Sequence, residues 1–130
     1  MKAYWDSSAL VEAVSDSALR ARLRSERGFT RTHTLAEVFS ALTGNPHVRF
    51  DADWSARTIE QLTGDLDFVD LSPADLVAAL KQAKRKGVRG GHVHDLLHAA
   101  AADKSQAQEL LTIDVNDFKA LPNRVTVTSV

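Results

Sequence analysis

Four acidic residues attract attention because each one lies beside or within an apolar stretch. They are Asp6, Glu37, Asp95 and Asp114, and their apolar neighbours predict that each carboxylate is partly buried. Buried carboxylates that share one cleft repel one another and lose hydration unless a cation is present. Several hard oxygen ligands favour Mg²⁺ or Mn²⁺ over Zn²⁺. Metal ions held in this way at an open cleft are the usual equipment for hydrolysing phosphodiester bonds.

Each acid also has a simpler interpretation when it is taken alone. An Asp at the start of a helix, such as Asp6 or Asp95, is more often a cap or a partner of the helix dipole than a metal ligand. Glu37 alone could pair with an arginine such as Arg31. The hypothesis of a metal site therefore depends on all four acids meeting at one place in the fold.

The elements that must position these acids can be predicted from composition and periodicity. Aromatic and β-branched content predicts strands at 3–6, 29–32, 68–71, 110–113 and 125–130. Apolar residues at helical spacing predict helices between them, with caps at Ser7-Ser8, Asp16, Thr34 and Ser72-Pro73, a further helix over 53–64, and another from about 92 to 102. The alternation predicts one α/β domain over 1–130, a three-layer α/β/α sandwich with a mostly parallel central sheet.

This topology predicts that the four acids converge. Ligands of an open parallel sheet bind outside the carboxyl ends of its strands. Asp6 and Asp114 directly follow predicted strands, whereas Glu37 and Asp95 lie early in the helices that begin at the same edge of the sheet.

Composition restricts the classes of protein that remain. The 130 residues carry a net charge of −1, so charge alone would not hold a nucleic acid. The absence of cysteine excludes a disulfide framework and a thiolate zinc site. No apolar run approaches the roughly 20 residues that span a bilayer, and Asp6 comes too early for a signal peptide. We therefore expect a cytoplasmic protein without a membrane partner.

Three histidines surround Asp95 in the sequence. His92, His94 and His98 could be read as a zinc site, but His94 and His98 share one helix face and His92 precedes the helix. We favour contact with solvent or RNA for these side chains. His94 or His98 could also act as a proton donor near the cleft.

Two groups of basic residues could contact RNA phosphates. Lys84, Arg85, Lys86 and Arg89 lead directly into the Asp95 segment, and are the better placed group. Phosphate contacts of this kind position a strand without specifying its sequence. The arginines at 20, 22, 24 and 27 are interpreted as a solvated helix face.

Four motifs together resemble the PIN-domain family, in particular the VapC toxins of prokaryotic toxin–antitoxin pairs. They are Tyr4-Trp5-Asp6-Ser7-Ser8-Ala9-Leu10, Thr34-Leu35-Ala36-Glu37-Val38, His94-Asp95-Leu96-Leu97-His98-Ala99-Ala100-Ala101 and Leu111-Thr112-Ile113-Asp114-Val115-Asn116-Asp117-Phe118. No motif is specific alone, but their order, spacing and total length are.

The resemblance implies both a fold and an activity. It implies strand order 3-2-1-4-5, Mg²⁺ or Mn²⁺ at Asp6, Glu37, Asp95 and Asp114, and endoribonuclease activity on an RNA substrate. It also implies a homodimer and a small antitoxin that covers the cleft. By position, Ser8 and Thr112 would orient carboxylates through hydrogen bonds, and Asp117 would either extend the site to a second ion or cap a helix.

Three other functions stay open at this point. The chain could be a PIN-fold nuclease of RNA processing that has no antitoxin. It could be a phospho-receiver-like signalling domain, although the first strand ends in one Asp and the last strand region offers only Lys119. It could also be a catalytically silent interaction module, against which the presence of all four acids speaks.

Overall fold

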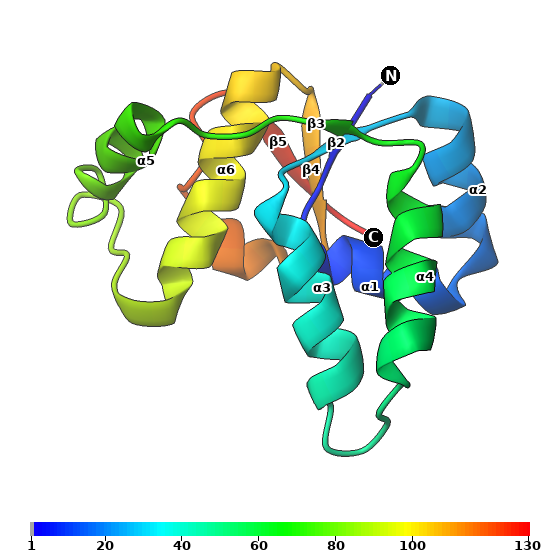
Figure 1. Cartoon of the computed structure of the whole chain (residues 1–130). Helices are drawn as coiled ribbons and strands as arrows, with labels where there is room; N and C mark the ends of the chain where they lie inside the picture. The colour runs from blue at the N-terminus through cyan, green and yellow to red at the C-terminus, as the bar shows by residue number, and fades with distance from the viewer. Residues whose placement is uncertain (1) are drawn as a thin grey trace.

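A computed structural model describes residues 2–130, in which five parallel strands form one sheet (Figure 1). The strands are β1 (Tyr4–Trp5), β2 (Phe29–Thr30), β3 (Asp67–Phe68), β4 (Glu109–Thr112) and β5 (Thr126–Ser129). They lie in the order β3-β2-β1-β4-β5. The predicted sheet and strand order are confirmed, and β1, which leads into Asp6, lies at the centre.

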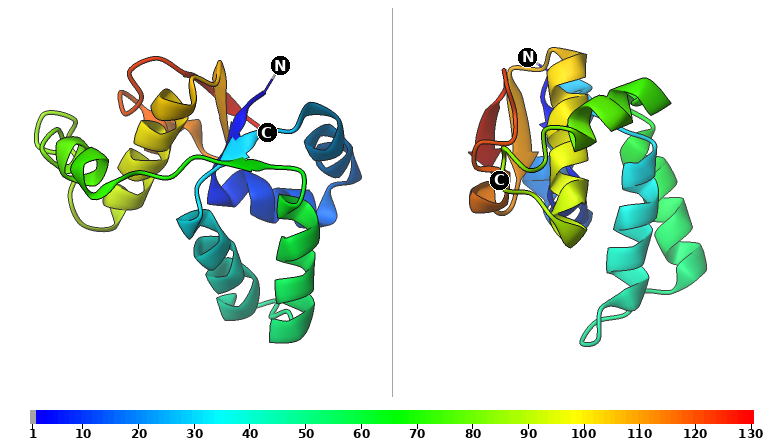
Figure 2. Two further views of the ribbon diagram at one scale, coloured as in Figure 1. Left: turned by 45° about the horizontal axis from the view of Figure 1, so that its top comes forward. Right: turned by 90° about the vertical axis from the view of Figure 1, so that its left-hand side faces the viewer.

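Helices cover both faces of this sheet. They are α1 (Ser7–Ser15), α2 (Ser17–Glu26), α3 (His33–Gly44), α4 (Ala52–Thr63), α5 (Pro73–Leu80) and α6 (Val93–Ser105), with short 3₁₀ helices η1 (Gly90–His92) and η2 (Val115–Phe118). α5 and α6 lie on one side of the sheet, and α1 to α4 lie on the other (Figure 2). α3 and α4 run side by side as an arm that extends from the body (Figure 1).

Two separate cores hold the layers together, because neighbouring side chains of a strand point to opposite faces. Trp5 and Leu111 pack toward α1, α3 and α4, whereas Tyr4 and Leu110 pack toward α6. All four of these side chains are fully buried. The central strands β1 and β4 are therefore packed on both faces. This packing fixes the positions of the residues that directly follow them.

Several boundaries differ from the predictions. β3 is Asp67–Phe68, so the predicted strand at 68–71 was placed too late. α1 begins at Ser7 because Asp6 itself caps it, rather than Ser7-Ser8. Thr34 does not cap α3 but lies within it, where its hydroxyl accepts a hydrogen bond from Thr30 at 2.9 Å. Within residues 2–130, none of the helices has the length and apolar character needed to cross a membrane.

Gly28 allows β2 to approach β1 closely, and we expect Gly28→Ala to destabilise the fold. A Cβ at this position would lie against the carbonyl oxygen of Ala3 and 2.7 Å from Nε1 of Trp5. Both neighbours belong to the packed centre, so we expect a loss of about 1 to 3 kcal/mol in the free energy of unfolding. Chemical denaturation would measure this loss. Gly44→Ala is the matched control, since a Cβ there meets nothing within 4 Å; an equal loss in both variants would contradict the explanation.

Candidate active site

Asp6 is a buried carboxylate at the point where β1 passes into α1. Its Oδ1 accepts hydrogen bonds from the backbone N–H of Ala9 and from the hydroxyl of Ser8, each at 2.8 Å. Ser8 Oγ in turn accepts from the N–H of Ile113 at 3.0 Å and lies 3.1 Å from Thr112 Oγ1. Ser8 donates its single hydroxyl proton to Asp6, and Thr112 is close enough to both side chains to donate its own proton to either of them.

This environment sets both the orientation and the charge of Asp6. Burial raises the pKa of its carboxyl, because the charged form loses hydration, while hydrogen bonds from Thr112, Ala9 and Ser8 oppose the shift. The side chain is only 3% exposed. Ser8 and Thr112 therefore make the contacts expected of residues that orient a ligand carboxylate.

Asp95, in the first turn of α6, carries the most strongly perturbed carboxyl of this region. Burial, together with the negative charges of Asp117 and Asp6, raises its pKa to about 6. His92 Nε2 lies 3.7 Å from Asp95 Oδ2 and partly offsets these charges. Asp6, which follows β1, and Asp117 of η2 thus lie close enough to repel the carboxylate of Asp95.

Glu37 extends from α3 toward the same region, and its carboxylate forms a hydrogen bond with a buried histidine. Its Oε1 lies 2.9 Å from His98 Nε2, and its Oε2 lies 3.5 Å from Ser7 Oγ. Burial alone would raise the pKa of Glu37, but the hydrogen bond and charge of His98, together with the charges of His33 and His94, lower it. The suggested ion pair with Arg31 is wrong, because Glu37 is paired with His98 instead.

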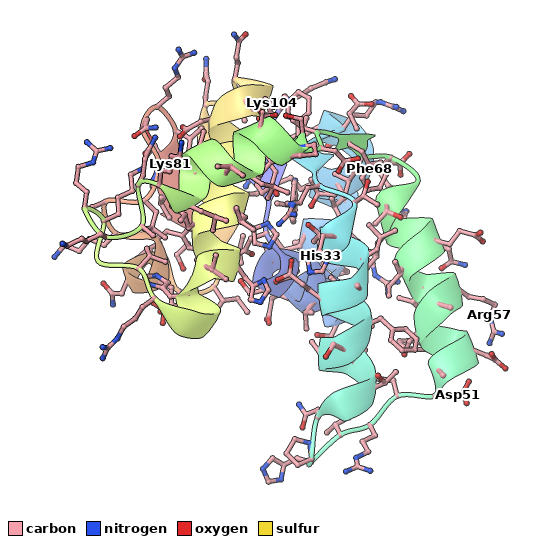
Figure 3. All side chains as sticks on the ribbon, turned by 60° about the vertical axis from the view of Figure 1, so that its left-hand side comes forward. His33, Asp51, Arg57, Phe68, Lys81 and Lys104 are labelled. Carbon is pink, nitrogen blue, oxygen red and sulfur yellow. The ribbon has the colours of Figure 1, made fainter. Side chains whose placement is uncertain are left out.

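The three histidines near Asp95 have three different environments. His92 Nε2 lies 2.6 Å from the carbonyl oxygen of Asp117 and therefore donates to it. His94 stacks on His33 of α3 with ring centroids 6.0 Å apart, and Figure 3 shows His33 on the side of α3 toward α6. His98 is 1% exposed and bonds Tyr4 and Glu37. The alternative of a zinc site is therefore not supported, and the expected solvent or RNA contact is wrong for His98.

Asp114 lies at the carboxyl end of β4 but does not share the environment of the other acids. It is exposed rather than partly buried, and its Oδ1 accepts the backbone N–H of Asn116 at 3.0 Å, which caps η2. The carboxylate that approaches Asp95 from this segment is Asp117. The sequence also allows Asp117 to be a helix cap, but in the structure Asp114 is the residue that caps η2.

The basic residues of 84–89 divide into one anchored side chain and three exposed ones. Lys86 donates to the carbonyl oxygen of Leu121 and to Asn123 Oδ1, and burial lowers its pKa. Lys84, Arg85 and Arg89 are exposed. On α2, Arg20 donates to the carbonyls of Ala13 and Val14 at the end of α1, and Arg22 donates to Glu26 and Glu109, so these two arginines have structural partners.

An open groove lies along α3 and includes Glu37. It is lined by Ser7, His33, Ala36, Glu37, Ser40, Ala41 and His94. The exposed apolar side chains of Ile113 and Val115 flank Asp114 on the segment after β4. The groove leaves room for an extended chain to pass across the front of Glu37.

The donor set fits a divalent cation in its chemistry, although its side chains are not gathered into a finished binding site. Asp6, Asp95 and Asp117 supply hard oxygens, and the raised pKa of Asp95 reflects its burial first and then the neighbouring negative charges. Across residues 2–130, no three His, Asp or Glu side chains are grouped closely enough to hold an ion as they stand. An ion would therefore draw these carboxylates together.

Tyr4, His33 and His98 are the members of the site that sequence reasoning missed or misplaced. His98 interrupts the apolar run from Leu96 to Ala102, and a polar side chain at a core position needs a hydrogen-bond partner. That signal was available in the sequence. The identity of its partners was not, because Tyr4 and Glu37 are 94 and 61 residues away.

Comparisons with known proteins agree on the fold. A family model described as PIN domain matches residues 3–123. Among solved structures, VapBC2 from Rickettsia felis bound to a promoter DNA fragment aligns with a TM-score of 0.72 and 19% identity, covering 100% of this chain and 99% of that one. PAE2754 from Pyrobaculum aerophilum aligns with a TM-score of 0.74 and 19% identity, covering 98% and 89%. A search of curated proteins found no match.

Proposed function

Since the chain belongs to the PIN-domain family, we propose that it is an endoribonuclease that hydrolyses RNA phosphodiester bonds with Mg²⁺ or Mn²⁺ as cofactor. The proposed ligands are Asp6, Glu37, Asp95 and Asp114, with Asp117 as a further acid. One observation carries the proposal: carboxylates from distant parts of the sequence lie near one another, and burial together with the charges of Asp117 and Asp6 raises the pKa of Asp95 to about 6. A partly buried carboxyl whose pKa is raised in this way, beside other carboxylates, is typical of a site that binds a cation.

Different residues of the chain would bind the ion and the RNA substrate. A bound divalent ion would supply positive charge and an activated water for the hydrolysis. Asp6, oriented by Ser8, and Asp95 are our first choices for direct ligands, and Glu37 would act directly or through water. The groove along α3 would accept the RNA, with exposed Lys84, Arg85 and Arg89 as candidate phosphate contacts.

Metal-dependent cleavage is the direct test of this function. Purified protein would be incubated with labelled single-stranded RNA in Mg²⁺ or Mn²⁺, with EDTA in a parallel reaction. We expect cleavage that stops when the chelator is added and returns when the ion is restored. Cleavage that continues in EDTA, or that persists in Asp6→Asn, would refute the assignment, because asparagine can still cap α1 but cannot supply a charged ligand.

The acids at 114 and 117 can be ranked by a matched pair of substitutions. We expect Asp117→Asn to reduce cleavage about tenfold and Asp114→Asn to reduce it less. Both acids are exposed, but Asp117 adds charge beside Asp95, whereas Asp114 already accepts a hydrogen bond from the backbone N–H of Asn116. Initial rates at one RNA concentration would measure both, and a larger loss in Asp114→Asn would reverse the ranking.

We further propose a small antitoxin as partner, as the resemblance to VapC toxins implies. The neighbouring structure from Rickettsia felis is VapBC2 with promoter DNA, and the groove and exposed apolar side chains of this chain suit a covering segment. Inspection of the adjacent reading frame and co-expression of its product would test this. We also propose a cytoplasmic homodimer, whose mass light scattering would measure.

The alternatives can be separated from this proposal. A receiver-like domain is excluded by topology, because such domains have strand order 2-1-3-4-5 rather than the order found here. A PIN-fold nuclease of RNA processing would cleave RNA but have no adjacent antitoxin gene. A silent interaction module would show no heat of Mn²⁺ binding in calorimetry.

A further inference from the structure

His98 is the most deeply buried histidine of the site and links three elements of the fold. Its Nδ1 lies 2.9 Å from the hydroxyl of Tyr4 on β1, and its Nε2 lies 2.9 Å from Glu37 Oε1 on α3. The imidazole itself belongs to α6, and it is 1% exposed. Both ring nitrogens are therefore occupied by side chains from other parts of the chain.

The direction of these hydrogen bonds follows from the two partners of His98. A carboxylate oxygen of Glu37 only accepts, so Nε2 carries a ring proton and donates to it. Burial raises the pKa of the Tyr4 phenol far above its usual value, so its hydroxyl keeps a proton that it can donate to Nδ1. If this hydroxyl donates to Nδ1, the ring proton must be on Nε2, where it points at Glu37. The result is a chain of donors that runs from Tyr4 through His98 to the carboxylate.

Glu37 consequently has one oxygen in a short hydrogen bond with His98 and the other in a long contact with Ser7. Oε1 accepts from His98, whereas Oε2 lies near Ser7 on the side of the open groove. His98 is also close enough to Asp6 and Asp95 for a charge on its ring to lower their pKa values. His98 is thus the imidazole that contacts Glu37 and also lies near both of the other acids.

We propose that His98 is a positioning residue for Glu37, fixed in its Nε2–H tautomer by Tyr4 so that the second carboxylate oxygen faces the groove before an ion or substrate arrives. This inference rests on the proposed function, since it takes Glu37 as a metal ligand. Residues that orient ligands in this way typically contribute roughly 10- to 100-fold to metal affinity or activity.

Two substitutions of His98 separate positioning from a merely structural role. Glutamine places an amide donor near the position of Nε2 and can still reach Glu37, whereas asparagine is shorter and reaches only toward Tyr4. Both remove the ring and leave an amide in the core, so their general effect on packing is similar. Mn²⁺ affinity would be measured by calorimetry for the parent, His98→Gln and His98→Asn, together with the melting temperature without metal.

We expect His98→Asn to weaken Mn²⁺ binding roughly tenfold or more, and His98→Gln to stay close to the parent. Equal affinities in all three proteins would overturn the inference. So would equal weakening in both variants that follows their loss in melting temperature, because that result indicates a structural role alone. In the metal-free parent, ¹⁵N NMR of the imidazole should show the Nε2–H tautomer, and the Nδ1–H tautomer would also overturn it.

The same measurements distinguish a failure of the His98 inference from a failure of the proposed function. If the parent binds Mn²⁺ and His98→Asn binds it equally well, the inference fails and the proposed function stands. If the parent binds no Mn²⁺, the proposed function fails, and the positioning of a metal ligand fails with it.

Discussion

Asp95→Asn is expected to reduce RNA cleavage by at least about 100-fold and, in the same protein, to stabilise the metal-free fold. The loss of activity follows because a neutral amide is a much weaker partner for a divalent ion than a carboxylate. The several kcal/mol of charge stabilisation that such an ion provides correspond to a rate factor of this size or more.

The gain in stability follows from the pKa of Asp95. A folded-state pKa of about 6 lies above the ordinary value of 3.8, so the folded protein binds more protons than the unfolded chain between these values. Stability is therefore lost as the pH rises from about 4 to 6, and the full penalty is present at pH 7. Because the side chain is 29% exposed, solvent screening reduces this penalty, and we expect asparagine to recover about 1 to 2 kcal/mol.

Two measurements on one variant check this combination. Cleavage rates in Mn²⁺ give the first effect, and chemical denaturation in EDTA at pH 7 gives the second. Asp53→Asn is a suitable control, because Asp53 is an exposed residue in the first turn of α4, on the arm. A variant that loses both activity and stability would show that Asp95 is a structural cap. A variant that keeps its activity would remove Asp95 from the site.

Lowering the pH from 7 to 5 is expected to weaken Mn²⁺ binding about tenfold through Asp95 alone. A proton and a metal ion compete for the same carboxylate, and a group with a pKa of about 6 is mostly ionised at pH 7 and mostly protonated at pH 5. Calorimetry at pH 5, 6, 7 and 8 would measure the apparent affinity, which should rise through pH 6 and then level off.

Asp117→Asn identifies the group responsible for this transition. Removing the charge of Asp117 takes away one of the causes that raise the pKa of Asp95, so the midpoint should move to lower pH. A midpoint that does not move would assign the transition to a nearby histidine, such as His92, instead. An affinity that is flat from pH 5 to 8 would contradict a raised pKa at Asp95.

The sequence alone was sufficient for the fold and for two of the acids. Alternating strands and helices imply a parallel sheet, and the carboxyl ends of its strands lie at one edge, so Asp6 was placed correctly by periodicity. Asp95 was placed by the first turn of its helix. Ser8 could be named as a partner of Asp6 because both belong to one helix cap, which is a local feature.

Contacts between distant segments were not predictable in this way. Pattern indicated that Asp114 would be buried, but the turn after β4 exposes it and brings Asp117 toward Asp95 instead. Asp114 and Asp117 lie three residues apart and are both exposed, and the turn of a short 3₁₀ helix decides which of them approaches Asp95. Periodicity does not resolve such a turn.

The amino-acid sequence by itself determined the α/β class and the edge of the sheet at which the acids lie, because these depend on short-range pattern and residue type. The order of the strands was implied by the resemblance to a known family and not by pattern, and the tertiary structure agrees with it. Only the tertiary structure decided that His98 turns into the core between Tyr4 and Glu37, and that Arg31 does not pair with Glu37. The physical reason is that a buried polar group takes whichever partner the packed layers bring within hydrogen-bond distance.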